Sequence, residues 1–275
     1  MKGFRNRAVF FLLTGVSVIF LFPILIVLMN SFKGKLYISS EPFALPTPET
    51  FAGFDNYTDG LTKTGFFSAF LTSLLVTVLS VAAIVIFTSM TAWYITRVKN
   101  TFTKLSYYAF VFSMVVPFQM VMFTTVKTAN VLNLDNPLGL VVLYLGFGSG
   151  LSVFMFSGFV KSIPVEIEEA AMIDGCGPIR TFFLVVFPLM KPTTITVAIL
   201  NAMWIWNDYL LPYLVIGSDY KTIPIAIQYL RGGYGSIDMG AMMAMLVLSI
   251  LPIVIFYLLC QKHIIKGVVA GAVKG

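Results

Sequence analysis

Apolar residues in this chain follow one another for about twenty positions at a time, without the alternation of a half-buried β-strand. A helix needs about 20 apolar residues to cross a hydrocarbon core of about 30 Å. Because lipid offers backbone amides no hydrogen-bond partners, each such run is expected to be helical. The runs lie at residues 8–30, 66–96, 105–126, 138–160, 193–216 and 240–260. The pattern predicts an all-α fold: a polytopic membrane helix bundle with six transmembrane helices, in a single domain over residues 1–275.

Composition and charge agree with a membrane location. Hydrophobic residues make up 58% of the chain and charged residues 11%, and the mean hydropathy is +0.92. Twelve of the 18 Lys and Arg residues lie in four segments, 2–7, 97–104, 161–191 and 262–274, which six spans would place on one side. The positive-inside rule therefore predicts that both termini and the loop 161–192 are cytoplasmic. This rule also explains the net charge of +6, so we expect no nucleic-acid partner.

The residues that enzymes and metal proteins need are scarce. An ATP-binding P-loop requires G-x-x-x-x-G-K-[ST], whereas the only Gly-Lys pair, Gly34-Lys35, is followed by Leu36. The sole histidine, His263, follows the last apolar run and has no neighbouring cluster of metal ligands in the sequence. We therefore expect no enzymatic activity, no metal and no cofactor bound by this chain.

The loop 161–192 contains a charged segment that reads as a short helix. Pro164 suits a first helical turn, where its missing N–H costs nothing. Acidic residues near a helix N-terminus interact favourably with the helix dipole, and Gly175 is a residue at which the helix can end. The acidic residues are Glu166, Glu168, Glu169 and Asp174. The residues alone leave two interpretations open for Pro164 to Gly175: a helix that docks on another protein, or a solvated connector.

Two motifs carry a family resemblance. Glu169-Ala170-Ala171, then Gly175, then Val185-x-Phe187-Pro188, resembles the EAA loop (E-A-A-x3-G-x9-I-x-L-P) of ABC importer permeases, with Val185 and Phe187 in place of Ile and Leu. The run Trp206–Pro212, WNDYLLP, is similar to the W-N-D-[FY]-x-x-P run of carbohydrate-importer permeases. The ending 267–275 resembles that of the second, shorter permease of maltose-type systems.

This resemblance implies an assembly. It implies a second homologous permease subunit, two cytoplasmic ABC ATPase subunits that bind ATP and Mg, and an external solute-binding protein. It also implies that the helix in the loop 161–192 is a coupling helix seated on an ATPase. The residues implied in this coupling are Pro164, Glu166, Glu168, Glu169, Ala170, Ala171, Asp174, Gly175 and Pro188.

Polar residues in the fifth run are candidates for the translocation path. Asn201, Trp204 and Asp208 are spaced three and four apart and share one helical face, with Asn207 beside them. A polar stripe facing lipid would be costly, which favours a path. The alternative is an interfacial cap, with the tryptophans in the aromatic belt. In maltose-type systems the other permease holds most of the sugar, which weakens the case for direct contact by Asp208.

Two external segments are less informative. The resemblance places between the last spans a loop that enters the binding protein's cleft, which here corresponds to Arg231, Gly232, Gly233, Tyr234 and Gly235; a plain surface turn is the alternative. The proline-rich segment from Phe32 to Gly65 is expected to be irregular. We also expect Pro117 to kink the third span, and the glycines at 146, 148 and 150 to allow either close helix crossing or a local break.

Taken together, these features predict a transmembrane permease subunit of an ATP-driven, binding-protein-dependent ABC importer in the bacterial cell membrane. The expected substrate is a sugar, and the resemblance favours an oligosaccharide, although glycerol-phosphate and monosaccharide systems share the motifs. Two other classes remain open on the residues alone. These are an ion-coupled secondary carrier and a membrane scaffold or sensor that transports nothing.

Overall fold

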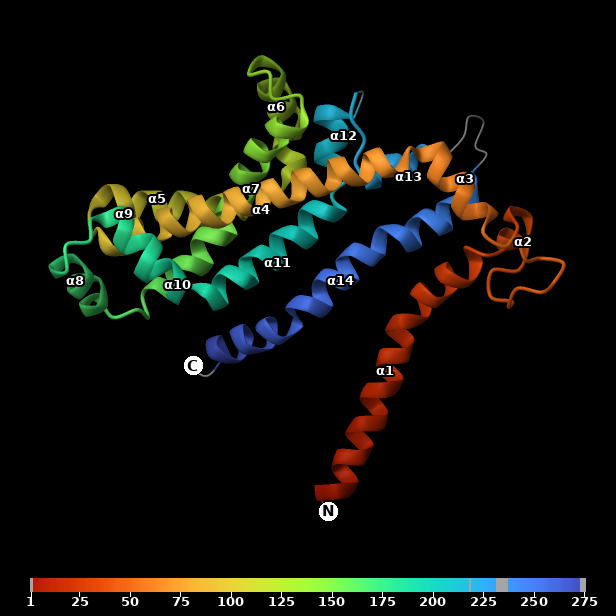
Figure 1. Cartoon of the computed structure of the whole chain (residues 1–275), viewed down its shortest axis with the longest axis horizontal. Helices are drawn as coiled ribbons and strands as arrows, with labels where there is room; N and C mark the ends of the chain where they lie inside the picture. The colour runs from red at the N-terminus through yellow and green to blue at the C-terminus, as the bar shows by residue number, and fades with distance from the viewer. Residues whose placement is uncertain (1, 218, 231–236, 273–275) are drawn as a thin grey trace. The chain divides into compact units, whose positions relative to one another are not determined.

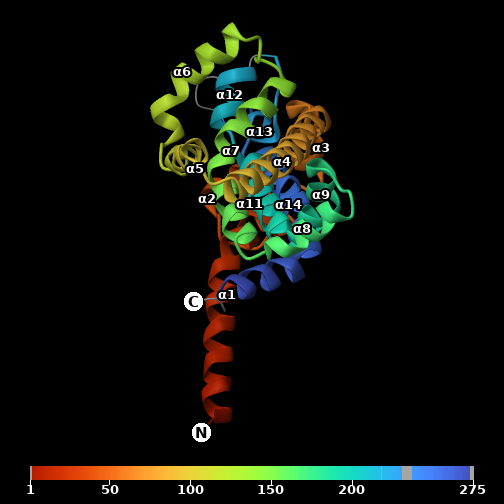
Figure 2. The same cartoon turned by 90° about the vertical axis from the view of Figure 1, so that its left-hand side faces the viewer.

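The structure, a computed structural model, describes residues 2–217, 219–230 and 237–272, and it is built from helices (Figure 1; Figure 2 shows a second side). In chain order these are α1 (Lys2–Asn30), α2 (Lys35–Ser40), α3 (Asp55–Thr64), α4 (Phe66–Arg97), α5 (Thr101–Ser113), α6 (Phe118–Val131), α7 (Pro137–Val160), α8 (Val165–Ile173), α9 (Pro178–Thr181), the π-helix η1 (Phe182–Val186), α10 (Phe187–Leu189), α11 (Lys191–Asn207), α12 (Leu210–Ile216), α13 (Ile223–Gln228) and α14 (Met239–Ala272). They form two compact units. The first contains the chain up to Ala69 with Ile225–Pro252, and the second contains Phe70–Pro224 with the residues from Ile253 on.

Four of the six predicted spans are continuous helices. Within the described residues, the stretches long and apolar enough to cross a membrane are Val9–Asn30, Phe66–Arg97, Pro137–Val160 and Met239–Gln261. They coincide with the first, second, fourth and sixth apolar runs of the sequence. Two further stretches qualify only if a pair of bent helices counts as one span, which brings the number to six. The prediction of an all-α polytopic bundle is confirmed.

The third predicted span, 105–126, is not one kinked helix. Helix α5 ends at Ser113, and α6 begins at Phe118 after Pro117, whose backbone is extended (ψ 136°). The two helices are bent by 107°. Proline lacks an N–H and disfavours helical backbone in the residue before it. The helix therefore stops before Pro117 instead of bending through it.

The fifth predicted span, 193–216, is also interrupted. Helix α11 begins at Lys191 and ends at Asn207, because Asp208 leaves the helical conformation (ψ 125°). The Asp208 carboxylate accepts a hydrogen bond of 3.0 Å from the Leu210 N–H, where α12 begins. On its other side α11 is bent by 79° from the helical segment Pro178–Leu189, which the sequence assigned to the cytoplasmic loop.

The segment from Phe32 to Gly65 was expected to be irregular, and this was wrong in part, since it forms α2 and α3. Side-chain hydrogen bonds to the backbone fold it. Asn56 Nδ2 donates to the Ser31 and Lys33 carbonyls, both at 2.8 Å, and Lys33 Nζ donates to the Glu41 carbonyl at 2.8 Å. Gly65 ends α3 in the left-handed conformation, with φ of 59°. These local polar contacts order the segment, although its proline content had suggested irregular structure.

In the second unit, α7 packs against both α5 and α11. Glycine permits both approaches. A Cβ on Gly148 would lie 2.6 Å from Ile84 Cδ1 and 2.9 Å from Asn201 Oδ1, and one on Gly150 would lie 2.7 Å from the Phe110 carbonyl oxygen. Close crossing at small residues is how helices pack in lipid. The expectation of close crossing therefore holds for Gly148 and Gly150.

Candidate functional site

Helix α8 carries the charged motif of the loop 161–192. It is shorter than predicted: it runs from Val165 to Ile173, nine residues or about 14 Å, with Pro164 as the N-cap residue and Asp174 as the C-cap residue. Pro164 has an extended backbone (ψ 134°), so it precedes the first turn instead of belonging to it. Gly175 follows in the left-handed region, with φ of 85°, as a terminating glycine should.

Glu168 fastens α8 to the end of α4. Its side chain is buried, with 4% of the residue's surface exposed. One carboxylate oxygen accepts two hydrogen bonds from Arg97, at 2.7 and 3.0 Å, and the other accepts one from Trp93 Nε1 at 2.9 Å. Arg97 also donates to the Ile163 carbonyl at 2.8 Å, just before α8 begins. Charge-assisted hydrogen bonds of this kind are strong and directional, so this contact joins α8 firmly to the end of α4.

The sequence did not reveal this contact. Arg97 had been explained by the positive-inside rule, and Glu168 by the helix dipole. The two residues are 71 positions apart in the sequence. The only sequence signals are an arginine at the end of a span and a carboxylate in a short helix that already has others near its N-terminus. The structure thus separates Glu168, which points into the protein, from the exposed Glu166 and Glu169.

The outer surface of α8 is both acidic and apolar. Ile173 is 86% exposed and Met172 50%, beside the exposed Ala170 and Asp174. Pro188 in α10 is also exposed. Exposed isoleucine and methionine side by side at the end of a charged helix fit a surface that another protein covers. The arrangement favours docking over the connector interpretation.

The predicted polar face of the fifth run lies partly against α7. Tyr144 of α7 donates a hydrogen bond of 3.0 Å to the Asp208 carboxylate, and its ring meets that of Trp204 edge-on at 5.4 Å. Asn201 Nδ2 donates to Ser152 Oγ at 3.2 Å. Asn201, Trp204 and Asp208 are therefore brought together with α7.

Asn207 does not join this group. It is exposed, and its amide donates to the Met203 carbonyl of its own helix at 2.7 Å. Sequence reasoning missed the partners on α7. Tyr144, Gly148 and Ser152 are spaced four apart and thus lie on one face, a signal that was available in the sequence.

The predicted binding-protein loop, Arg231 to Gly235, lies outside the described residues. The described residues on either side are fixed: the Asp238 N–H donates to the Leu230 carbonyl at 3.1 Å. Lys63 bridges Asp59 and Asp238, at 2.7 Å each, and these hydrogen bonds raise the pKa of Lys63 above its ordinary value. Burial acts to raise the pKa of Asp238, but hydrogen bonds from Lys63 and the Ala241 N–H bring it below its ordinary value.

Comparison with known proteins agrees with the motifs. Residues 89–269 match the family described as "Binding-protein-dependent transport system inner membrane component". The chain belongs to this family. It is 42% identical over 260 residues to the starch degradation products permease AmyC of Thermoanaerobacterium thermosulfurigenes, covering 94% of this chain and 93% of that one. It is 35% identical over 268 residues to the multiple sugar-binding transport permease MsmG of Streptococcus mutans, covering 96% and 95%.

A solved structure shares the fold. A chain from the crystal structure of a bacterial ABC transporter that imports the acidic polysaccharide alginate matches with a TM-score of 0.78, covering 95% of each chain at 22% identity. The broken third and fifth spans thus occur within an overall arrangement that an importer permease also has.

Membership of the family decides the class of protein. The chain is an inner-membrane, multi-pass permease subunit of a binding-protein-dependent ABC importer, and it works with ATPase and binding-protein partners. A permease of this kind is a transport subunit and not a catalytic one, and it needs no cofactor of its own. The ion-coupled carrier and the non-transporting scaffold are thereby set aside.

Proposed function

We propose that this chain pairs with a second, homologous permease and two cytoplasmic ATPases, and that α8 is the helix through which ATPase closure moves the spans. The Arg97–Glu168 pair carries this proposal. It ties α8 to the last residue of a 32-residue helix, so a displacement of α8 is passed directly to α4. Transport by alternating access needs two packings of the spans, and ATP can shift them only if α8 is held differently in each.

The exposed end of α8 supplies the contact. Ile173 and Met172 offer apolar area, and Glu166 and Glu169 offer charge at the sides. Interfaces are commonly built this way, with an apolar centre and a polar rim. The orientation of the helix depends on Gly175, since other residues rarely adopt its backbone conformation.

The Ile173→Lys variant tests the docking. Because Ile173 is 86% exposed, the change is expected to leave the fold of the permease intact. A charge at the centre of an apolar contact should reduce ATPase recovered with the tagged permease by about tenfold or more. The measurement is the ratio of ATPase to permease after gentle solubilisation and affinity purification.

The matched control is Leu36→Lys on α2, an apolar residue that is 76% exposed and lies on the side predicted to be external. It should keep the wild-type ratio. Retention of ATPase by Ile173→Lys at the wild-type ratio would refute docking through α8. Wild-type permease that brings down a second permease but no ATPase would refute the larger assembly.

We infer further that the transported solute is an oligosaccharide. The names of AmyC and MsmG point to sugars, and the group on α7 and α11 has suitable chemistry. Trp204 is 41% exposed and offers an aromatic surface, while Tyr144, Asn201 and Asp208 offer hydrogen-bonding groups. A few placed polar groups on an otherwise apolar and aromatic lining are typical of sites for small molecules.

Uptake of labelled solutes tests this inference. Cells with the importer should accumulate malto-, arabino- or galacto-oligosaccharides, and deletion of this chain should abolish that uptake. Tyr144→Phe should lower uptake by about tenfold, because the half-buried Asp208 carboxylate loses its O–H donor. Asn207→Ala is the control and should leave uptake unchanged, since the exposed Asn207 side chain donates to the Met203 carbonyl of its own helix. Uptake of glycerol 3-phosphate with none of any oligosaccharide would contradict the proposed substrate.

A further inference from the structure

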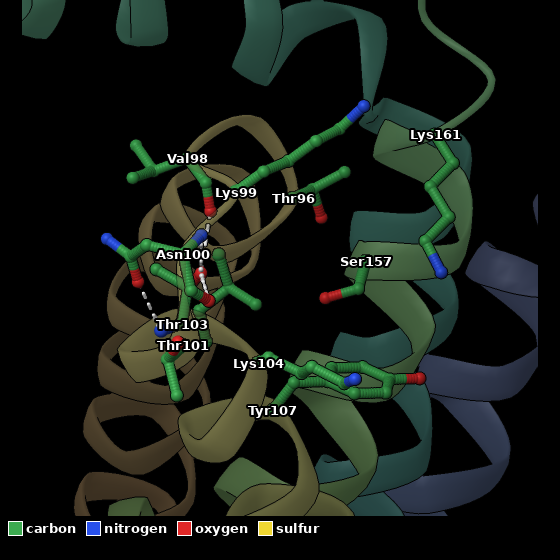
Figure 3. A pocket seen from close by; sticks show the side chains of 11 residues that line it. Thr96, Val98, Lys99, Asn100, Thr101, Thr103, Lys104, Tyr107, Ser157 and Lys161 are labelled. Carbon is green, nitrogen blue, oxygen red and sulfur yellow. Dashed lines mark hydrogen bonds between the residues drawn. The ribbon is translucent and has the colours of Figure 1, made fainter.

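A pocket of about 520 Å³ opens where α4 ends, α5 begins and α7 ends (Figure 3). Its lining comes from the last turn of α4, the α4–α5 link, the first two turns of α5, and the end of α7 with the residue that follows it. It contains none of the residues assigned above to coupling or to the translocation path. Its residues all belong to the second unit of the chain.

Three lysines surround the pocket. Lys99 comes from the α4–α5 link, Lys104 from α5 and Lys161 from the residue after α7. Among the described residues, the ion pairs are those of Lys63 and Arg97, and none involves these three lysines. The described lining includes no carboxylate. Lys161 Nζ lies 5.6 Å from the centre of the Tyr107 ring, which holds this ammonium group at the pocket wall.

A buried hydroxyl points into the same space. Ser157 of α7 is 1% exposed, and its Oγ has no hydrogen-bond partner among the described residues. Figure 3 shows this hydroxyl directed towards the middle of the pocket. A buried serine hydroxyl normally bonds a carbonyl one turn back, as Ser89 does to Ile86 at 3.0 Å. Burying a hydroxyl without a partner is costly, so its orientation indicates an acceptor that the pocket would hold.

The N-terminus of α5 adds a third source of positive potential. Asn100 caps this 13-residue helix: its side chain accepts from the Thr103 N–H at 2.8 Å, and its carbonyl accepts from the Lys104 N–H at 3.1 Å. The amides of Thr101 and Phe102 precede that first helical bond. Amide donors and the positive end of the helix dipole together favour an anion.

We propose that this pocket binds a phosphate-bearing anion through Lys104, Lys161 and the Ser157 hydroxyl, with Lys99 at its edge. Membrane topology alone explains lysines at helix ends. It does not explain a buried hydroxyl that faces the pocket and has no hydrogen-bond partner among the described residues. Phosphate offers several acceptor oxygens at once, which suits ammonium, hydroxyl and amide donors arriving from different sides. The anion is either the headgroup of an acidic phospholipid, since the pocket lies at the ends of two spans, or free phosphate.

The pocket lies beside the contact between α4 and α8, so a bound anion would affect that contact. Thr96 and Val98 line it, and between them Arg97 holds Glu168 of α8. Lys161 lies three residues before Pro164, the N-cap of α8. A bound anion would bridge the α4–α5 link and the segment that leads into α8, next to the contact that joins α8 to α4. The binding itself does not depend on the assembly proposed above.

The test uses the permease purified with the subunits that accompany it, in nanodiscs of phosphatidylcholine with or without phosphatidylglycerol. Lipid retained by the protein is measured by native mass spectrometry, and binding of inorganic phosphate by the shift in unfolding temperature. The variants are Lys104→Gln/Lys161→Gln and Ser157→Ala, with Lys191→Gln as the control, an exposed lysine outside the pocket. Ser157→Ala removes a hydroxyl that has no hydrogen-bond partner among the described residues, so this variant should fold normally.

We expect the lysine pair variant to lose about tenfold or more in affinity and Ser157→Ala about fivefold, with Lys191→Gln unchanged. Binding of phosphatidylglycerol without inorganic phosphate would identify a lipid headgroup, and a phosphate shift in both kinds of nanodisc would identify free phosphate. Either result supports the proposed site if both pocket variants bind that probe more weakly than the wild type does. Wild-type binding by Ser157→Ala, equal losses in Lys191→Gln, or no binding of either probe to the wild type would overturn it.

Discussion

Arg97→Met is expected to cost about 3 kcal/mol of unfolding free energy and to abolish transport. The substitution leaves the buried Glu168 carboxylate without its cation and the Ile163 carbonyl without its donor. Leaving one buried charge without its partner costs far more free energy than the intact pair contributes. The end of α4 should therefore separate from α8. The measurements are denaturant unfolding of the purified permease and uptake by cells with matched permease levels.

The double variant Arg97→Met/Glu168→Gln separates this explanation from a general loss of packing. With both charges removed, the double variant should be more stable than the sum of the single costs predicts, by about 1 kcal/mol or more. Lys63→Met, which removes two more exposed ion pairs in the first unit, should cost less than Arg97→Met, about 1 kcal/mol per pair at most. Purely additive costs in the double variant, or an Arg97→Met protein as stable as the wild type, would contradict the expected coupling.

The sequence predicted the continuous spans well because their signal is local. Twenty apolar residues in lipid have only one stable backbone conformation, and this holds whatever the rest of the chain does. The helices α4 and α7 therefore begin and end within a residue or two of the predicted runs. Boundaries failed where one side chain competed with the helix. Asp208 accepts the Leu210 N–H and stops α11 inside an apolar run that hydropathy treats as continuous.

The same distinction explains the candidate sites. The motif around Gly175 could be recognised in the sequence because its helix and its turn are formed by neighbouring residues. The left-handed glycine lies where the motif requires one. The contacts of Glu168 with Trp93 and Arg97, and of Asp208 with Tyr144, join positions more than sixty residues apart. These partners meet only because the helices that carry them pack together, so a local pattern, such as the shared polar face on α7, could mark candidates but could not pair them.

Gly150→Ala and Gly146→Ala are expected to have opposite effects, although the two glycines lie four residues apart on one helix. A Cβ on Gly150 would lie 2.7 Å from the Phe110 carbonyl oxygen and 2.8 Å from Ser113 Oγ, so α5 must move away from α7. Overpacking of this kind costs about 1–3 kcal/mol, and here the obstacle is backbone, which yields less readily than a side chain.

A Cβ on Gly146 meets nothing within 4 Å. Alanine there removes backbone freedom that glycine loses on folding, which is worth about 0.4–1 kcal/mol in soluble proteins, so this variant should unfold no more readily than the wild type. Unfolding midpoints of the two purified variants, measured side by side, decide the matter. Equal destabilisation by both would mean that helix α7 tolerates no side chain at either position. A stable Gly150→Ala variant would mean that α5 does not pack on α7 as the structure has it.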